Sequence, residues 1–237
     1  MKINKINLLF TLSSLSVLLV TIERFSFTTK ILLQPYNFLR LHEMVQMIFL
    51  ILFTTLIPFL LLKEVSQNLE SLKSRRGLIL GLAFITGVYF YATGNGLHEM
   101  ASFVFNTYCD TKKITGNLCG GLFFNDYYTG NIFYFIGAAL MNLVLIIFEQ
   151  MQPNKIFGKN DMTLLVINSL VYSLAIFAYA GFDRVLVGLV YSLIMTVVVG
   201  LFFLKRKKSY INYPVTTSLT IAYTIGTVAS LFVRFLH

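Results

Sequence analysis

The chain has 237 residues, of which 57% are hydrophobic and 12% are charged, and its mean hydropathy is +0.75. Soluble domains carry about 25% charged residues, so this composition excludes an ordinary water-soluble protein. The formal net charge of +9 comes from basic residues spread among the segments that flank the apolar runs. No recognition motif accompanies them, so a nucleic-acid partner is not indicated.

Apolar runs long enough to cross a membrane occur seven times along the sequence. A helix needs about 20 such residues to span a hydrocarbon core of roughly 30 Å. In chain order the runs cover residues 7–23, 42–62, 77–97, 130–150, 162–181, 185–204 and 214–235. We therefore expect an all-α fold, a polytopic integral membrane bundle of about seven transmembrane helices, with residues 1–237 forming a single transmembrane helical domain.

The basic residues between these runs favour a cytoplasmic N-terminus in a plasma or inner membrane, because lysine and arginine are retained on the cytoplasmic side. With that orientation twelve basic residues face the cytoplasm: Lys2, Lys5, Lys63, Lys73, Arg75, Arg76, Lys155, Lys159, Lys205, Arg206, Lys207 and Lys208. Seven lie outside: Arg24, Lys30, Arg40, Lys112, Lys113, Arg184 and Arg234. The first run could instead be a cleaved signal peptide, but no small-residue cleavage pattern follows Val20, so we expect it to be retained.

Two segments between the runs have a character of their own. Residues 24–40 place aromatic and aliphatic residues between basic ones, which indicates an interfacial segment against the outer leaflet. Residues 106–128 contain glycines and polar residues typical of turns and predict a long outer loop. Cys109 and Cys119, the two cysteines of the chain, lie in this loop. A disulfide between them is expected in an oxidising compartment, with two free thiols as the alternative.

The tetrapeptide Leu-His-Glu-Met occurs twice, at residues 41–44 and 97–100, in a chain with three histidines. Glu43 lies 20 residues before Lys63, and His98 lies 22 residues after Arg76, so each His-Glu pair is about 30 Å from a cytoplasmic basic residue at helical rise. The two runs should form an antiparallel hairpin through their short basic loop. We expect convergence at the outer side of four residues: His42, Glu43, His98 and Glu99.

A metal centre is the most specific interpretation of this cluster, because imidazole and carboxylate can hold zinc and leave a position for a reactive water. The predicted ligands of such a divalent metal are His42, His98 and Asp126. Glu43 or Glu99 would be the catalytic base. Further binding or orienting groups are Gln46, Asn95 and Asn125. The HExxH motif is absent, and Asp183 and His237 are weaker candidates at the same side.

The same residues also have a purely structural interpretation. They could be ordinary interfacial residues that bond to one another, to Arg40 or to lipid headgroups. Likewise, Gly94 and Gly96 could unwind their helix and open a concavity, or could merely permit close helix packing.

Seven spans that bring histidines and an aspartate towards one membrane face resemble, in architecture, the membrane metal hydrolases related to alkaline ceramidases and progestin/adipoQ receptors. The resemblance implies metal-assisted hydrolysis within a helical bundle. This chain departs from the family pattern, because those proteins supply two histidines from the last span and residues 214–236 contain none. A retinal protein is disfavoured as well, because the last span lacks the lysine needed for a Schiff base.

We therefore expect a multi-pass membrane protein with an outward-facing His/Glu/Asp site, in the sharpest version a metal-dependent hydrolase acting on a lipid or amphipathic substrate. Membrane lipid is the expected partner, and zinc the expected cofactor. One alternative is a small-solute transporter or channel lined by Asn142, Asn168, Tyr172, Tyr191, Tyr223 and Thr224. Another is a receptor or assembly factor that uses an aromatic outer face, formed by residues such as Tyr89, Tyr91, Phe123, Phe124, Tyr127, Tyr128 and Tyr134.

Overall fold

The computed structural model describes residues 4–152 and 157–236, with residues 206–209 described in their backbone only. Within these ranges seven helical segments are long and apolar enough to cross a membrane, so the predicted all-α membrane bundle is confirmed. The elements are α1 (Lys5–Arg24), η1 (Phe27–Lys30), α2 (Leu41–Val45), η2 (Gln46–Leu50), α3 (Ile51–Val65), η3 (Glu70–Lys73), α4 (Arg75–Tyr108), α5 (Asn117–Phe124), η4 (Asn125–Gly130), α6 (Asn131–Met151), α7 (Lys159–Phe182), α8 (Val187–Arg206), η5 (Lys207–Asn212) and α9 (Pro214–Leu236).

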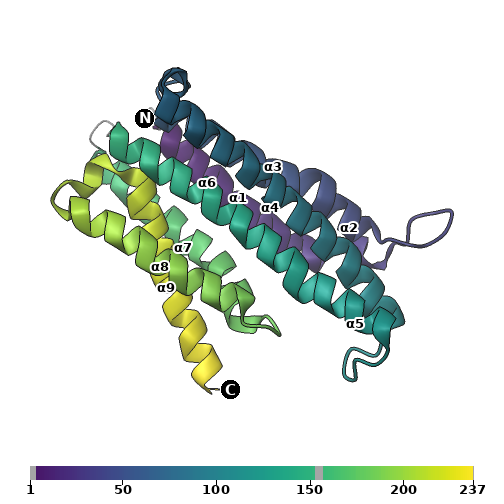
Figure 1. Cartoon of the computed structure of the whole chain (residues 1–237). Coiled ribbons are helices and arrows are strands. Elements are labelled where there is room, and N and C mark those ends of the chain that lie inside the picture. The colour runs from purple at the N-terminus through teal and green to yellow at the C-terminus, as the bar shows by residue number, and fades with distance from the viewer. Residues whose placement is uncertain (1–3, 153–156, 237) are drawn as a thin grey trace.

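The spans form two groups, one that contains α4 and α6 and one that consists of α7, α8 and α9. α4 packs along α6, and α7 packs along α9, while α1 contacts both α3 and α7. In Figure 1 the group of α7, α8 and α9 runs at an angle to α4 and α6, and the two groups separate towards the end that carries α5. We call this the disulfide end, because it holds Cys109 and Cys119, and the end with α1 Lys5 and η3 the opposite end.

The close pairing of α4 and α6 follows from glycines that face one another across the contact. A Cβ added at Gly94 would lie 2.2 Å from the backbone nitrogen of Tyr134, and one added at Gly137 would lie 2.2 Å from that of Tyr91. Helices in lipid associate through such small residues because they let the backbones approach. Of the two roles considered for Gly94, local unwinding and close packing, the structure shows close packing, because the residue is helical and lies against α6.

Polar side chains join the remaining helices. Asn7 of α1 donates to Asp161 of α7 at 3.2 Å, and Asn168 of α7 donates to Thr11 of α1 at 3.0 Å. Ser169 of α7 and Ser218 of α9 lie 2.8 Å apart. Hydrogen bonds between spans stabilise a bundle that has no hydrophobic driving force within lipid.

The prediction of a long loop over residues 106–128 is wrong for most of that range. α4 continues to Tyr108, and the chain resumes as helix at Asn117, so the non-helical connection is residues 109–116. Aromatic packing explains the added helix, because the Phe123 ring lies 5.6 Å from that of Phe105 and 4.7 Å from that of Tyr127. The predicted disulfide is confirmed, since Cys109 is bonded to Cys119.

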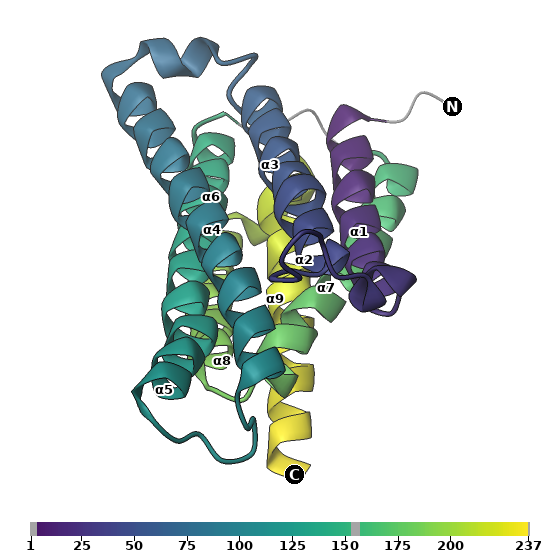
Figure 2. The same ribbon diagram turned by 90° about the vertical axis from the view of Figure 1, so that its right-hand side faces the viewer.

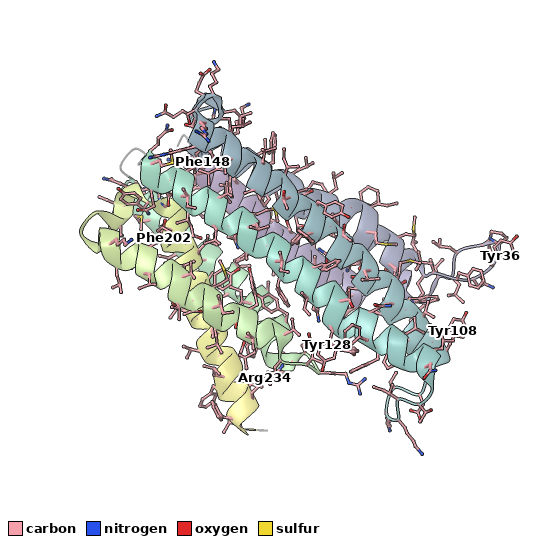
Figure 3. The ribbon with its side chains drawn as sticks, in the orientation of Figure 1. Tyr36, Tyr108, Tyr128, Phe148, Phe202 and Arg234 are labelled. Carbon is pink, nitrogen blue, oxygen red and sulfur yellow. A yellow bond between two sulfur atoms is a disulfide. The ribbon has the colours of Figure 1, made fainter. Side chains whose placement is uncertain are left out.

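Residues 25–40 project from the bundle beside α2 (Figure 1), as expected for an interfacial segment. A single antiparallel bridge joins Leu32 and Arg40. The aromatic side chains of this segment are exposed, with Phe25 at 84% and Tyr36 at 74%. Tyr36 stands at its far tip (Figure 3).

Candidate functional site

The predicted site residues lie at the disulfide end, where two spans depart from α-helical geometry. η2 and η4 are both π-helical segments, the first following α2 and the second leading into α6. Gln46 begins η2, and Asp126 lies in η4. Single π-helical turns within α-helices occur frequently at functional sites, so their position beside these residues supports a site here.

The central contact is between His98 of α4 and Asp126 of η4. His98 Nδ1 lies 2.8 Å from Asp126 Oδ1 and 3.1 Å from the backbone carbonyl oxygen of the same residue. The glycine contact of α4 and α6 produces this juxtaposition, because a Cβ at Gly130 would lie 3.0 Å from the backbone nitrogen of His98. The Asp126 side chain is 1% exposed, whereas the His98 side chain is 37% exposed.

These contacts assign the proton on the His98 ring. A carbonyl oxygen can only accept a hydrogen bond, so Nδ1 must carry the hydrogen that it donates. In the neutral ring the lone pair then lies on Nε2, which bonds to no residue that the structure describes. Both carboxylate oxygens of Asp126 are buried without a hydrogen-bond partner among the described residues, so Oδ1 meets His98 as an ion-pair contact, while the hydrogen bond from Nδ1 goes to the backbone carbonyl.

His42 belongs to a second acid–imidazole pair. Its Nδ1 lies 2.5 Å from Glu23 Oε2 at the end of α1, and Gln46 donates to the same oxygen at 2.9 Å. Thr28 donates to the other oxygen, Oε1, at 2.5 Å. Both carboxylate oxygens of Glu23 therefore accept hydrogen bonds, and the residue links α1 to α2. Sequence reasoning passed over Glu23 as a site residue, although its place at the end of a span of known length put it level with His42.

Glu43 is a structural carboxylate in this arrangement. Its side chain is 2% exposed, accepts from the backbone nitrogen of Arg40 at 3.0 Å, and forms an ion pair with the Arg40 guanidinium. A carboxylate held in this way at the start of α2 caps the helix and neutralises an arginine. The geometry therefore does not support the prediction of Glu43 as a catalytic base.

The other predicted residues flank the two pairs. Glu99 is half-buried, makes no hydrogen bond to the described residues, and interacts electrostatically with His98 and His42. Asn95 donates to the backbone oxygen of Tyr91 within α4 at 3.2 Å. Asn125 is half-buried beside Asp126, and its side chain makes no hydrogen bond among the described residues.

The predicted metal centre is not assembled by this geometry. Among residues 4–152 and 157–236, no group of three or more His, Cys, Asp and Glu side chains is placed to hold a metal ion. His98 and Asp126 meet, but His42 is paired with Glu23 instead. α3 packs against α1 and α6 more than against α4, and α3 and α4 stand apart in Figure 2. The expected hairpin therefore does not bring the two imidazoles onto one ligand position.

Asp183 continues the polar layer towards α7 and α9. It accepts from Asn131 of α6 at 2.9 Å through Oδ2, and its backbone oxygen accepts from Arg234 of α9 at 2.7 Å. Burial raises the pKa of the Asp183 carboxyl above its ordinary value, and the backbone N–H of Arg184 opposes that rise. His237, the other weaker candidate, lies outside the described residues.

No family model, no curated protein and no solved structure matches the chain. The function must therefore be inferred from the contacts themselves.

The polar residues considered for a transport route bond largely to one another between helices. Asn142 of α6 donates to the Tyr223 hydroxyl of α9 at 3.1 Å, and that hydroxyl lies 2.5 Å from the Tyr191 hydroxyl of α8. Asn168 bonds to α1, as described above, and Thr224 is exposed on the bundle surface. These contacts make Asn142, Asn168, Tyr191 and Tyr223 links between helices.

Proposed function

We propose that the chain is a multi-pass membrane protein whose functional site is the His98–Asp126 pair, facing outward, and that this pair hydrolyses a lipid or other amphipathic substrate. The observation that carries the proposal is a partly exposed imidazole whose Nδ1 is held by the backbone carbonyl of Asp126 and lies against its buried carboxylate, which leaves Nε2 without a described partner. This is the arrangement of a general base, in which the carboxylate holds the ring in the correct tautomer and stabilises the imidazolium that forms.

The reaction proceeds by base-assisted attack of water. Nε2 of His98 accepts a proton from water as the water oxygen bonds to the carbonyl carbon of the substrate. The ring then carries protons on both nitrogens, and Asp126 stabilises its positive charge. Collapse of the tetrahedral intermediate breaks the bond to the leaving oxygen or nitrogen, which takes the proton from Nε2. His98 and Asp126 are returned to their starting states.

A lipid or amphipathic substrate suits the location of the pair. His98 lies about 33 Å along α4 from Arg76 at helical rise, which places it near the hydrocarbon boundary. A water molecule and the polar part of a lipid can both reach this depth. The metal-dependent version receives no support from the ligand geometry, because no three candidate ligands converge among the described residues.

The test compares His98→Gln and Asp126→Asn with His42→Gln in purified protein reconstituted in vesicles, using a panel of ester and amide lipids. Loss of a general base lowers turnover by about 10²- to 10⁴-fold, so we expect that loss in the first two variants. The matched control His42→Gln removes an imidazole at the same depth and is expected to keep at least half of the rate. Equal losses in all three variants, or no turnover of any lipid in the panel, would contradict the proposal.

Metal analysis of the same preparations distinguishes the metal-dependent version. We expect turnover to survive treatment with a chelator. Stoichiometric zinc that is lost equally from His42→Ala and His98→Ala would instead establish a shared centre and exclude the metal-free reaction. Flux into the same vesicles tests the transport alternative, and flux that persists in His98→Gln would assign transport to other residues.

A further inference from the structure

Two grooves open at the disulfide end, and Leu186, which precedes α8, lines both of them. The first has a volume of about 460 Å³ and is lined by Tyr128, Arg184, Val185, Leu186, Val187 and Val190. The second has a volume of about 500 Å³ and is lined by apolar residues of α7, α8 and α9 together with Arg234. Each groove therefore combines an apolar wall with one arginine. Tyr128 and Arg234 lie at this end beside the turn between α7 and α8 (Figure 3).

The apolar walls lie on the bundle surface. Leu186 is 58% exposed and Val190 is 52% exposed. Both residues lie at the start of the membrane span formed by α8. In a bilayer such a wall is covered by hydrocarbon, because water cannot occupy it favourably. Leu186 borders both grooves, so two chains of one molecule can lie on its two sides.

The arginines retain unused hydrogen-bond donors. Arg184 Nη2 donates to the backbone oxygen of Thr111 at 2.9 Å, and the guanidinium lies 5.4 Å from the ring centres of Phe123 and Tyr127. The Arg184 side chain also forms a hydrogen bond with Tyr127, and its guanidinium, which carries five N–H donors, keeps others for a ligand. Arg234 uses Nε and Nη2 for three backbone carbonyls, and its Nη1 bonds to no described residue.

The charges around Arg184 favour an anion. Lys112 and Lys113 follow Thr111 directly, so the contact with Thr111 brings the basic part of the disulfide loop to the groove. Of the neighbouring carboxylates, Asp110 accepts from the backbone nitrogen of Lys112, and Asp183 accepts from Asn131. Asp126, which interacts electrostatically with Tyr127 and Asp183, is a third carboxylate nearby, so the four basic side chains Arg184, Arg234, Lys112 and Lys113 outnumber the carboxylates by one.

We propose that these grooves bind one anionic glycerophospholipid, with its phosphate on Arg184 and its two acyl chains on either side of Leu186. Arginine binds phosphate through paired charge-assisted hydrogen bonds, which a zwitterionic lipid with a bulky cationic headgroup satisfies less well. The apolar walls bind the acyl chains, and the arginine makes the site selective for an anionic over a zwitterionic headgroup. This site is separate from the His98–Asp126 pair and does not depend on its chemistry.

The test measures which lipids remain on the purified full-length protein. The protein is reconstituted in vesicles of equal phosphatidylglycerol and phosphatidylcholine, extracted in mild detergent, and its lipid adducts are counted by native mass spectrometry. We expect a preference for phosphatidylglycerol of about fivefold or more, and we expect Arg184→Gln to reduce it to near one. Lys30→Gln is the matched control, because Lys30 is a basic residue of the same end outside both grooves, and it should keep the preference.

Two further variants separate the parts of the site. Arg184→Lys keeps the charge and should give an intermediate preference, and it remains informative if Arg184→Gln does not fold. Val190→Trp fills the first groove and should reduce phosphatidylglycerol adducts although Arg184 is intact. Wild-type protein without a preference, a preference unchanged in Arg184→Gln and Arg184→Lys, or full retention in Val190→Trp would overturn the proposal.

Discussion

A single carboxylate on α6 holds the beginning of α9. Glu149 is fully buried, and its Oε1 accepts from the backbone nitrogen of Val215 at 2.7 Å. Its Oε2 accepts from the backbone nitrogen and the hydroxyl of Thr216, at 2.8 and 2.7 Å. The first N–H groups of a helix have no partner within the helix, and a negative charge near them is favourable.

We predict that Glu149→Gln lowers the free energy of unfolding by about 1–3 kcal/mol, because an amide NH₂ would face a buried N–H donor that then has no acceptor. Thermal unfolding of the purified protein in detergent measures the loss. The control is Glu70→Gln, since Glu70 pairs with Lys73 at 2.7 Å but both side chains are more than 60% exposed. Exposed pairs contribute about 0–1 kcal/mol, so little change is expected there. An unchanged midpoint in Glu149→Gln would refute the assigned role.

At the residue scale the sequence predicted half of the candidate site. The pairing of His98 with Asp126 could be anticipated, because both lie at the outer ends of spans that are neighbours in the chain. The partner of His42 could not, because Glu23 reaches it through the packing of α1 against α3, and span lengths fix depth but not which helices are adjacent. For Glu43 the structure agrees with the structural alternative, in which the residue bonds to Arg40, and the sequence alone could not decide between that role and a catalytic one.

At the scale of helices, the contact of α4 with α6 admits no side chain at two positions. A Cβ at Gly137 would lie 2.2 Å from Tyr91 N and 2.5 Å from Gly87 O, and all of these are backbone atoms that cannot move independently. The residues around Gly94 are equally close. The two helices must therefore separate if either glycine is replaced.

We predict that Gly137→Ala and Gly94→Ala each destabilise the protein by about 1–3 kcal/mol, as expected for overpacking of a tight contact. Gly200→Ala in α8 is the control, because a Cβ there meets nothing within 4 Å and alanine favours helix over glycine. Thermal unfolding of the three variants under one condition tests this. A smaller loss in Gly137→Ala than in Gly200→Ala would be incompatible with the contact.

The sequence predicted the helices well, because hydropathy over about 20 residues is a strong signal. The predicted boundaries are wrong at residues 106–108 and 117–128, which are helical. The stretch 106–128 is rich in glycine and polar residues, so its sequence alone indicated a loop. The helical form of these residues depends on aromatic contacts such as Phe105 with Phe123, which join segments that local sequence cannot relate. No sequence pattern identified the π-helical segments η2 and η4.

At the scale of the whole molecule, the charge distribution predicts the orientation in the membrane. The described basic residues at the opposite end include Lys5, Lys63, Lys73, Arg75 and Arg76, and such residues stay in the cytoplasm. The disulfide at the other end is typical of an oxidising compartment. Both features favour the same orientation.

We predict that a cysteine at Leu118 is labelled in intact cells by a membrane-impermeant maleimide, whereas a cysteine at Gln67 is labelled only after permeabilisation. Both Leu118→Cys and Gln67→Cys are made in a chain carrying Cys109→Ser and Cys119→Ser. Leu118 is 76% exposed at the disulfide end, and Gln67 is exposed at the opposite end. The reverse labelling pattern would place the N-terminus outside the cell. The His98–Asp126 pair, at the other end of the bundle, would then lie on the cytoplasmic side.

The unequal lengths of the helices have a consequence for how molecules approach the bundle. α4 has 34 residues and is about 51 Å long, whereas α8 has 20 residues and is about 30 Å long. At the disulfide end α4, α5 and η4 therefore extend further from the opposite end than the start of α8 does (Figure 1). We therefore expect a lipid in the bilayer to approach the proposed grooves beside Leu186 from the side of α8, where the helices end earlier.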